Sequence, residues 1–166
     1  MRGVQILSEA VFSEALERAR GSARGRTNEN LHAGPSDNPH RFLNVLLRGT
    51  YVAPHRHRAP PKSETFLVLR GEIAAFVFDD SGRVARAERL GDPQQGVLPC
   101  AIDLAPGLWH SIVATSDEAI CFEVKPGPWD PATDKEFAEW APREGQDGGR
   151  AYLAHLEALA VALGRG

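Results

Sequence analysis

The stretch of sequence that decides the fold is GTYVAPHRHRAPPKSETFLVLRG, residues 49–71. Its two histidines, His55 and His57, are two residues apart, and alternate residues of a β-strand point to the same side of a sheet. Both imidazoles can therefore reach one metal ion. Glu64 follows at the head of an apolar run, where a buried carboxylate needs a partner and a metal ion is a natural one. The stretch predicts two strands that bring three metal ligands together.

A third imidazole lies far along the chain, in the segment PGLWH at residues 106–110. Its Pro-Gly pair predicts a tight turn, and His110 begins the strand that follows the turn. Neutral imidazoles with a carboxylate suit Fe, Mn, Ni or Zn, whereas a calcium site would be built from oxygen ligands. We therefore expect His110 to join His55, His57 and Glu64 around one divalent transition metal. Two other roles stay open for Glu64, an ion pair at the rim and a hydrogen bond that orients a ligating histidine.

The rest of the central region alternates short apolar runs with turn residues. The 16 glycines and 12 prolines of the chain favour many turns, and Asp79-Asp80-Ser81-Gly82 predicts a hairpin. About eight short strands with no helices between them indicate a β-sandwich or barrel. Beside the run at 65–70, the predicted strands cover residues 42–48, 73–78, 83–90, 98–105, 110–115 and 119–125.

The two flanks of this region have the patterns of helices. Residues 8–20 and 150–163 repeat apolar side chains at helical spacing, and each segment is followed by a glycine that can end a helix. A capping box predicts a further short helix over 133–140, whereas the polar residues 22–40 predict an ordered loop. The division that we expect is an N-terminal helix and polar segment packed on the barrel (8–40), the β-barrel (41–128) and a C-terminal helical extension (129–166).

Composition limits the functions that need to be considered. The chain has 166 residues, 42% of them hydrophobic and 25% charged, which fits one globular domain. Its net charge of −3 argues against a nucleic-acid partner. No run of about 18 apolar residues predicts a membrane span, and the first residues lack the apolar core of a secretory signal. Cys100 and Cys121 lie in strand-like runs, so we expect buried free thiols in a cytoplasmic protein.

The order of the histidines and glycines resembles the two motifs of the cupin superfamily. The matching patterns are Gly49-(x5)-His55-x-His57-(x6)-Glu64-(x6)-Gly71 and Pro106-Gly107-x-x-His110. Three features differ from the motifs: two extra residues before Glu64, a proline directly next to its glycine, and Ala114 where many cupins have Asn.

Further segments are similar to the WbuC family of cupin-fold metalloproteins, and this resemblance covers about residues 8–145. The segments are 30–32, 41–44, 54–57, 62–71, 109–110 and 122–128. The resemblance implies a single-domain cupin, that is, a jelly-roll barrel with an N-terminal helix and C-terminal helices, holding one divalent transition metal. Some members of that family are associated with polysaccharide gene sets.

These observations favour a metal-dependent enzyme that acts on a small polar, carbohydrate-related substrate. Isomerase, epimerase or lyase chemistry suits such a site, with Glu123, His32 and Lys62 as candidate proton carriers. An iron-dependent dioxygenase and a non-catalytic protein that binds a small ligand or sugar remain alternatives. A homodimer is also expected, since edge strands pair readily and the apolar stripe of 150–163 needs burial.

Several other polar and aromatic residues have two interpretations. Glu123 and Lys125 alternate with apolar residues, so they face either the barrel interior, as acid–base groups, or solvent, which we favour. Trp109 is expected to fill the core and not to stack on a sugar. His40 and His155 are expected at the surface.

Overall fold

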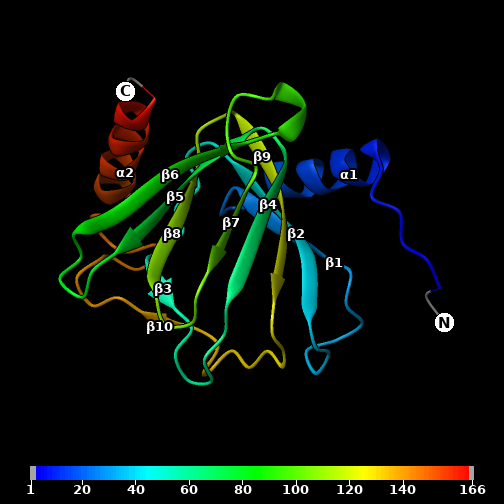
Figure 1. Ribbon diagram of the computed structural model, residues 1–166, viewed down its shortest axis with the longest axis horizontal. Helices are drawn as coiled ribbons and strands as arrows, with labels where there is room; N and C mark the ends of the chain where they lie inside the picture. Colours follow the sequence, from blue (N-terminus) through cyan, green and yellow to red (C-terminus); the bar gives the residue numbers. More distant parts are fainter. Residues whose placement is uncertain (1–2, 165–166) are drawn as a thin grey trace.

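The computed structural model describes residues 3–164, and within this range two antiparallel sheets of five strands lie between two helices (Figure 1). The mainly β, cupin-like fold predicted from the sequence is confirmed. The first sheet has the order β1 (Arg26–Asn30), β2 (His40–Leu47), β9 (Glu118–Lys125), β4 (Glu64–Arg70) and β7 (Ala101–Leu104). The second has the order β10 (Glu136–Phe137), β3 (His55–Arg56), β8 (Trp109–Ala114), β5 (Glu72–Phe78) and β6 (Val84–Gly91). A 3₁₀ turn, η1 (Pro93–Gln95), follows β6.

The main core lies between the inner faces of the two sheets. In β4, buried and partly buried residues alternate, and Phe66 and Val68 point into this core. Ile73 of β5 and Ile112 of β8 meet them from the other sheet. All six residues of β8 are buried, because the outer face of that strand is covered as well.

Helix α1 (Glu9–Arg20) covers the outer face of the first sheet. Its buried residues Ala15, Leu16 and Ala19 pack against Leu43 and Val45 of β2. The helix begins after Ser8 and ends at Gly21, as the sequence predicts.

Helix α2 (Gly149–Leu163) covers the outer face of the second sheet, beside β5 and β6 in Figure 1. Leu153, Leu156 and Ala160 are buried against Phe76 and Val113. Most of the apolar stripe predicted over 150–163 is therefore buried inside the same chain, whereas Leu163 at its end is 41% exposed. Among the described residues, neither helix is both long and apolar enough to cross a lipid bilayer.

Two predictions for the flanks are wrong. The segment 22–40, predicted to be a loop, contains β1, which pairs with β2 from Arg26↔Leu46 onward. The helix predicted over 133–140, and with it a second C-terminal helix, is replaced by turns and β10. Tertiary contacts decide this segment, because Glu136 lies opposite Arg56 of β3 and accepts two hydrogen bonds from its guanidinium, at 3.0 and 2.6 Å.

Candidate metal centre

Three strands bring the four predicted metal ligands together at one place between the sheets. His55 of β3 lies directly opposite His110 of β8, and His57 is the first residue after β3. Glu64 begins β4, in the other sheet. One ligand atom from each of the four residues lies within 4.8 Å of the others, and all four residues are buried.

The backbone fixes how the three imidazoles are protonated. In His55 and His110, Nδ1–H donates to the carbonyl two residues earlier, at 3.0 and 2.9 Å. The Nδ1–H of His57 donates to the carbonyl of Asp134. A neutral imidazole with its proton on Nδ1 presents a lone pair on Nε2. Each Nε2 is therefore free to bind a metal.

The contacts around Glu64 show that these atoms fit a cation. Glu64 Oε1 lies 2.9 Å from His57 Nε2, and Oε2 lies 2.8 Å from His110 Nε2. Within residues 3–164, both Nε2 atoms and Oε2 are buried without a hydrogen-bond partner. Buried lone pairs that face a carboxylate are costly unless a cation lies among them. The cluster could therefore hold a metal ion, and three imidazoles with one carboxylate suit a divalent transition metal.

Charge and burial keep His55 in the form that binds metals. Burial lowers the pKa of His55 well below its ordinary value, and the positive charge of Lys135 lowers this pKa further. The imidazole is therefore neutral at physiological pH.

A buried ion network lies directly behind the cluster. Lys62 Nζ is 2.7 Å from one carboxylate oxygen of Asp134 and also donates to the carbonyl of Pro128, at 2.6 Å. Lys125 Nζ is 3.0 Å from the other oxygen of Asp134 and 3.5 Å from Glu64 Oε1. Burial alone would raise the pKa of Asp134, but the two lysines hold it below its ordinary value. The network joins the segment after β9 to the cluster, and it leaves Lys62 buried between two acceptors.

Glu123 and Lys125 both face the interior, so the outward orientation that we favoured is wrong. Each is less than 7% exposed, because the neighbouring sheet and the segment after β9 cover this end of the strand. Burial, together with the charge of Glu64, raises the pKa of Glu123 to about 8. The Glu123 carboxyl group accepts a hydrogen bond from Asn44 Nδ2 at 2.8 Å. It is mostly protonated at neutral pH and can donate a proton.

A polar cavity of about 390 Å³ adjoins the cluster. Glu123, Lys125 and Asp134 form its wall on the side of the cluster, and Trp129 and Lys135 form part of its outer wall. None of the four cluster residues lines this cavity, but Lys125 contacts Glu64 and Asp134 contacts His57, so one layer of side chains separates the cavity from the cluster.

His32, predicted as a proton carrier, lies outside this cavity. Its ring stacks on His40 with the centroids 4.0 Å apart, and both side chains line a neighbouring cavity of about 660 Å³. Both are buried, so the surface position predicted for His40 is wrong, because the loop that ends at β2 folds back over it. His155, in contrast, is exposed on α2, as expected.

The tryptophans divide between core and surface. Trp109 fills the core, as predicted, and its indole N–H donates to Asp80 at 3.0 Å. Trp129 is 43% exposed and lines both polar cavities. The sequence analysis missed both Trp129 and Asp134. For Trp129, the available signal was a large aromatic residue in a proline-rich segment. Asp134 was missed because a helix was expected over 133–140.

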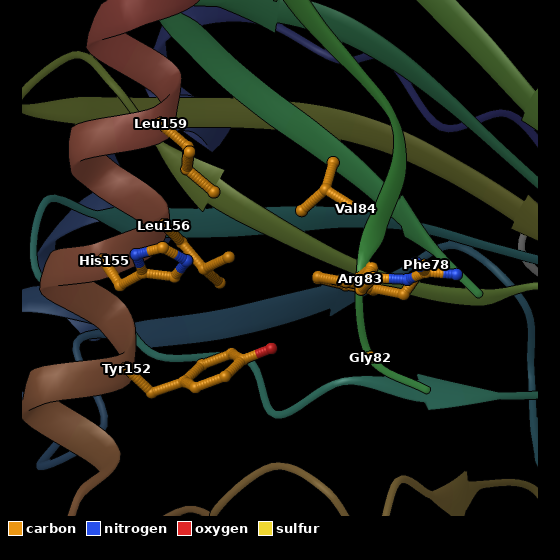
Figure 2. Close-up of a pocket in the computed structure, with 8 residues that line it drawn as sticks. All are labelled: Phe78, Gly82, Arg83, Val84, Tyr152, His155, Leu156 and Leu159. Carbon is orange, nitrogen blue, oxygen red and sulfur yellow. The ribbon is translucent and has the colours of Figure 1, made fainter. Parts of the chain in front are cut away.

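A third pocket lies away from these residues, between α2 and the β5–β6 hairpin. Figure 2 shows Tyr152, His155 and Leu156 of α2 facing Phe78 and Val84 of the hairpin. The pocket has a volume of about 380 Å³, and none of the four residues of the cluster lines it.

The fold and the site together define a protein of cupin-like fold with a buried cluster of three histidines and one glutamate. A family model described as a domain of unknown function, DUF6016, matches residues 7–90. This match spans just over half of the chain, which therefore belongs to that family. No curated protein matches the chain. The resemblance to the WbuC family stays a prediction.

Solved structures with the same fold include the capsular polysaccharide assembling protein CapF from Staphylococcus aureus. It is 19% identical with a TM-score of 0.57, and the match covers 71% of this chain and 33% of CapF. CapF with the inhibitor 3-isopropenyl-tropolone matches at 19% identity and a TM-score of 0.51, over 68% and 34% of the two chains. The cupin 2 domain-containing protein from Halorhodospira halophila matches at 20% identity and a TM-score of 0.48, over 81% and 80%. The chain thus spans about a third of the length of CapF, and likeness at this level shows the fold alone.

Proposed function

We propose that this protein is a metal-dependent enzyme that acts on a small polar, carbohydrate-related substrate by isomerase, epimerase or lyase chemistry. One observation carries the proposal: three Nε2 lone pairs and the Glu64 carboxylate converge beside a polar cavity. His55, His57, Glu64 and His110 would hold one Fe, Mn, Ni or Zn ion.

Each group at the site has a task in this proposal. When bound, a divalent metal would polarise a carbonyl or hydroxyl group of the substrate. Glu123, which is mostly protonated and lines the cavity, delivers and takes up the proton, and Asn44 orients its carboxyl group. Lys62 and Lys125 hold Asp134, whose carbonyl keeps the His57 ring in place.

The nature of the substrate rests on the chemistry of the cavity and on one structural relative. The lining is mainly polar and charged, which suits a hydroxyl-rich molecule. CapF, which shares the fold, is described as a capsular polysaccharide assembling protein. The proposal places the protein in the cytoplasm, where the free thiols of Cys100 and Cys121 stay reduced.

Metal content tests the first half of the proposal. Freshly purified protein is analysed for bound metals beside His57→Ala and the matched control His155→Ala, which removes an exposed histidine of α2. We expect about one ion per chain in the wild type and the control, and a sharp loss in His57→Ala. Glu64→Gln should lose less metal, because an amide oxygen remains. Full metal content in His57→Ala would overturn the assignment.

Proton exchange tests the second half. Isomerases, epimerases and lyases of this kind remove a proton from carbon, so the metal-loaded enzyme in D₂O should place deuterium in a sugar from a test panel. Glu123→Gln should slow this exchange by about 10²–10⁴-fold, the usual contribution of a general acid–base group. Oxygen consumption without exchange would support the iron-dependent dioxygenase, and saturable binding with neither would support the non-catalytic protein.

A further inference from the structure

We infer that the cavity beside the cluster takes an anionic sugar, with Lys135 as the partner of the anionic group and Trp129 as the platform for the ring. This inference rests on the proposed function and names the substrate class of the same site. It follows from the charges and the exposed aromatic surface of the cavity wall.

The cavity has an excess of positive charge. Its charged lining residues are four basic and two acidic side chains, namely Arg24, Arg26, Lys125, Lys135, Glu123 and Asp134. A wall of this kind attracts an anion, and a bound divalent metal adds to the same field.

Most of these cations already have an anionic partner in the protein. Arg26 lies 2.5 Å from Glu144, and Lys125 lies 3.0 Å from Asp134. Among the described residues, Lys135 makes no ion pair, and it lines the cavity together with Glu123 and Asp134. Lys135 is therefore the cation that is free to meet a ligand beside the cluster.

Trp129 supplies a flat apolar surface at the same place. The residue is 43% exposed and lines both this cavity and the neighbouring polar cavity that contains His32 and His40. Its backbone N–H donates to the carbonyl of Pro35 at 2.7 Å, which fixes the residue on the loop before β2. A large aromatic held at the mouth of a polar cavity is suited to stack on the apolar face of a sugar ring.

Calorimetry with three related probes tests this inference on the metal-loaded protein. D-glucose and D-glucuronate share one ring and differ in a carboxylate, and D-glucose 6-phosphate carries a phosphate instead. We expect at least one anionic probe to bind about tenfold more tightly than glucose. The anion that binds more tightly identifies a carboxylate or a phosphate as the natural group.

Variants assign the two contacts. Lys135→Gln should reduce the binding of the anionic probe to the level of glucose, whereas Lys135→Arg and Arg150→Gln, which removes an exposed charge on α2, should preserve it. Trp129→Ala should weaken every probe by up to about tenfold, and Trp129→Phe by less. All of these variants should keep their metal, so a failure here is separate from a failure of the metal site. Equal binding of glucose and both anions, no effect of Lys135→Gln or Trp129→Ala, or no saturable binding of any probe would overturn the inference.

Discussion

Glu123 and Lys125 are two residues apart on β9, point to the same side and are both buried, yet their surroundings differ. Burial alone would lower the pKa of Lys125. The neighbouring carboxylates of Glu64, Glu123 and Asp134 raise it above its ordinary value. Glu123 has the Asn44 amide as its hydrogen-bond donor, and burial raises its pKa to about 8. The same strand thus holds one permanent charge and one group that can exchange a proton near neutral pH.

The raised pKa of Glu123 predicts a loss of stability as the pH rises. Above its ordinary pKa the carboxyl group is ionised in the unfolded chain, while the folded chain keeps the proton up to about pH 8. Raising the pH from 6.5 to 7.5 should therefore lower the free energy of unfolding of the wild type by about 1 kcal/mol relative to Glu123→Gln. Urea unfolding of the chelated protein measures this change.

Glu123→Gln is the control for this effect, since a neutral amide has no proton to lose. Its free energy of unfolding should not fall over the same range. The lowered pKa values of His55 and His40 act in the opposite direction, because these imidazoles are still partly protonated in the unfolded chain at about pH 6.5, and they act equally in wild type and variant. A parallel decline in wild type and variant would contradict the assignment.

Local sequence patterns identified the residues of the cluster but not their surroundings. His55, His57, Glu64 and His110 could be found because strand alternation and a turn before a strand are local signals. The hydrogen bond from His57 to the carbonyl of Asp134 joins residues 77 positions apart, so no local sequence pattern could predict it.

At the scale of elements, length and apolar content separate the predicted strands from the missed ones. The runs that became β4, β5, β8 and β9 were predicted within a few residues, since their apolar side chains fill the core. In contrast, the missed strand β10 has only two residues, and the missed, polar β1 is held by its pairing with β2. Such elements depend on partners that are distant in the sequence.

The β5–β6 hairpin supplies a test of how its turn packs against the segment after β10. Gly82 has a φ of +85°, and a Cβ there would lie 2.6 Å from the ring of Trp140. Gly82→Ala should therefore lower the free energy of unfolding by about 2–4 kcal/mol, from the left-handed backbone and the overpacking together.

Gly96→Ala is a matched control for this hairpin. Gly96 has a φ of +66°, but a Cβ there has nothing within 4 Å. It should cost only the backbone strain, about 1 kcal/mol. Equal losses in chemical denaturation of the two variants would show that Trp140 does not restrict the turn.

At the scale of the whole molecule, each sheet has a covered outer face and open edges. The outer faces of the sheets are buried under α1 and α2, and Val161 and Leu163 are exposed apolar side chains on α2. The edges are β1 and β7 in the first sheet and β10 and β6 in the second. We therefore expect the predicted homodimer to form through edge strands.

Light scattering tests this assembly. A homodimer at high micromolar concentration should have about twice the chain mass of 18.0 kDa. A mass that stays at that of one chain would remove the prediction and leave the site within one subunit.

The measurement that tests the central claim most directly is anomalous X-ray diffraction from crystals of the protein with its native metal. Data collected at the absorption edge of that metal should show one peak inside the cluster. The peak should lie about 2.0–2.3 Å from the Nε2 atoms of His55, His57 and His110, with a Glu64 oxygen beside it. A cluster without a peak, or a peak more than about 3 Å from His110 Nε2, would contradict the metal site on which the proposed function rests.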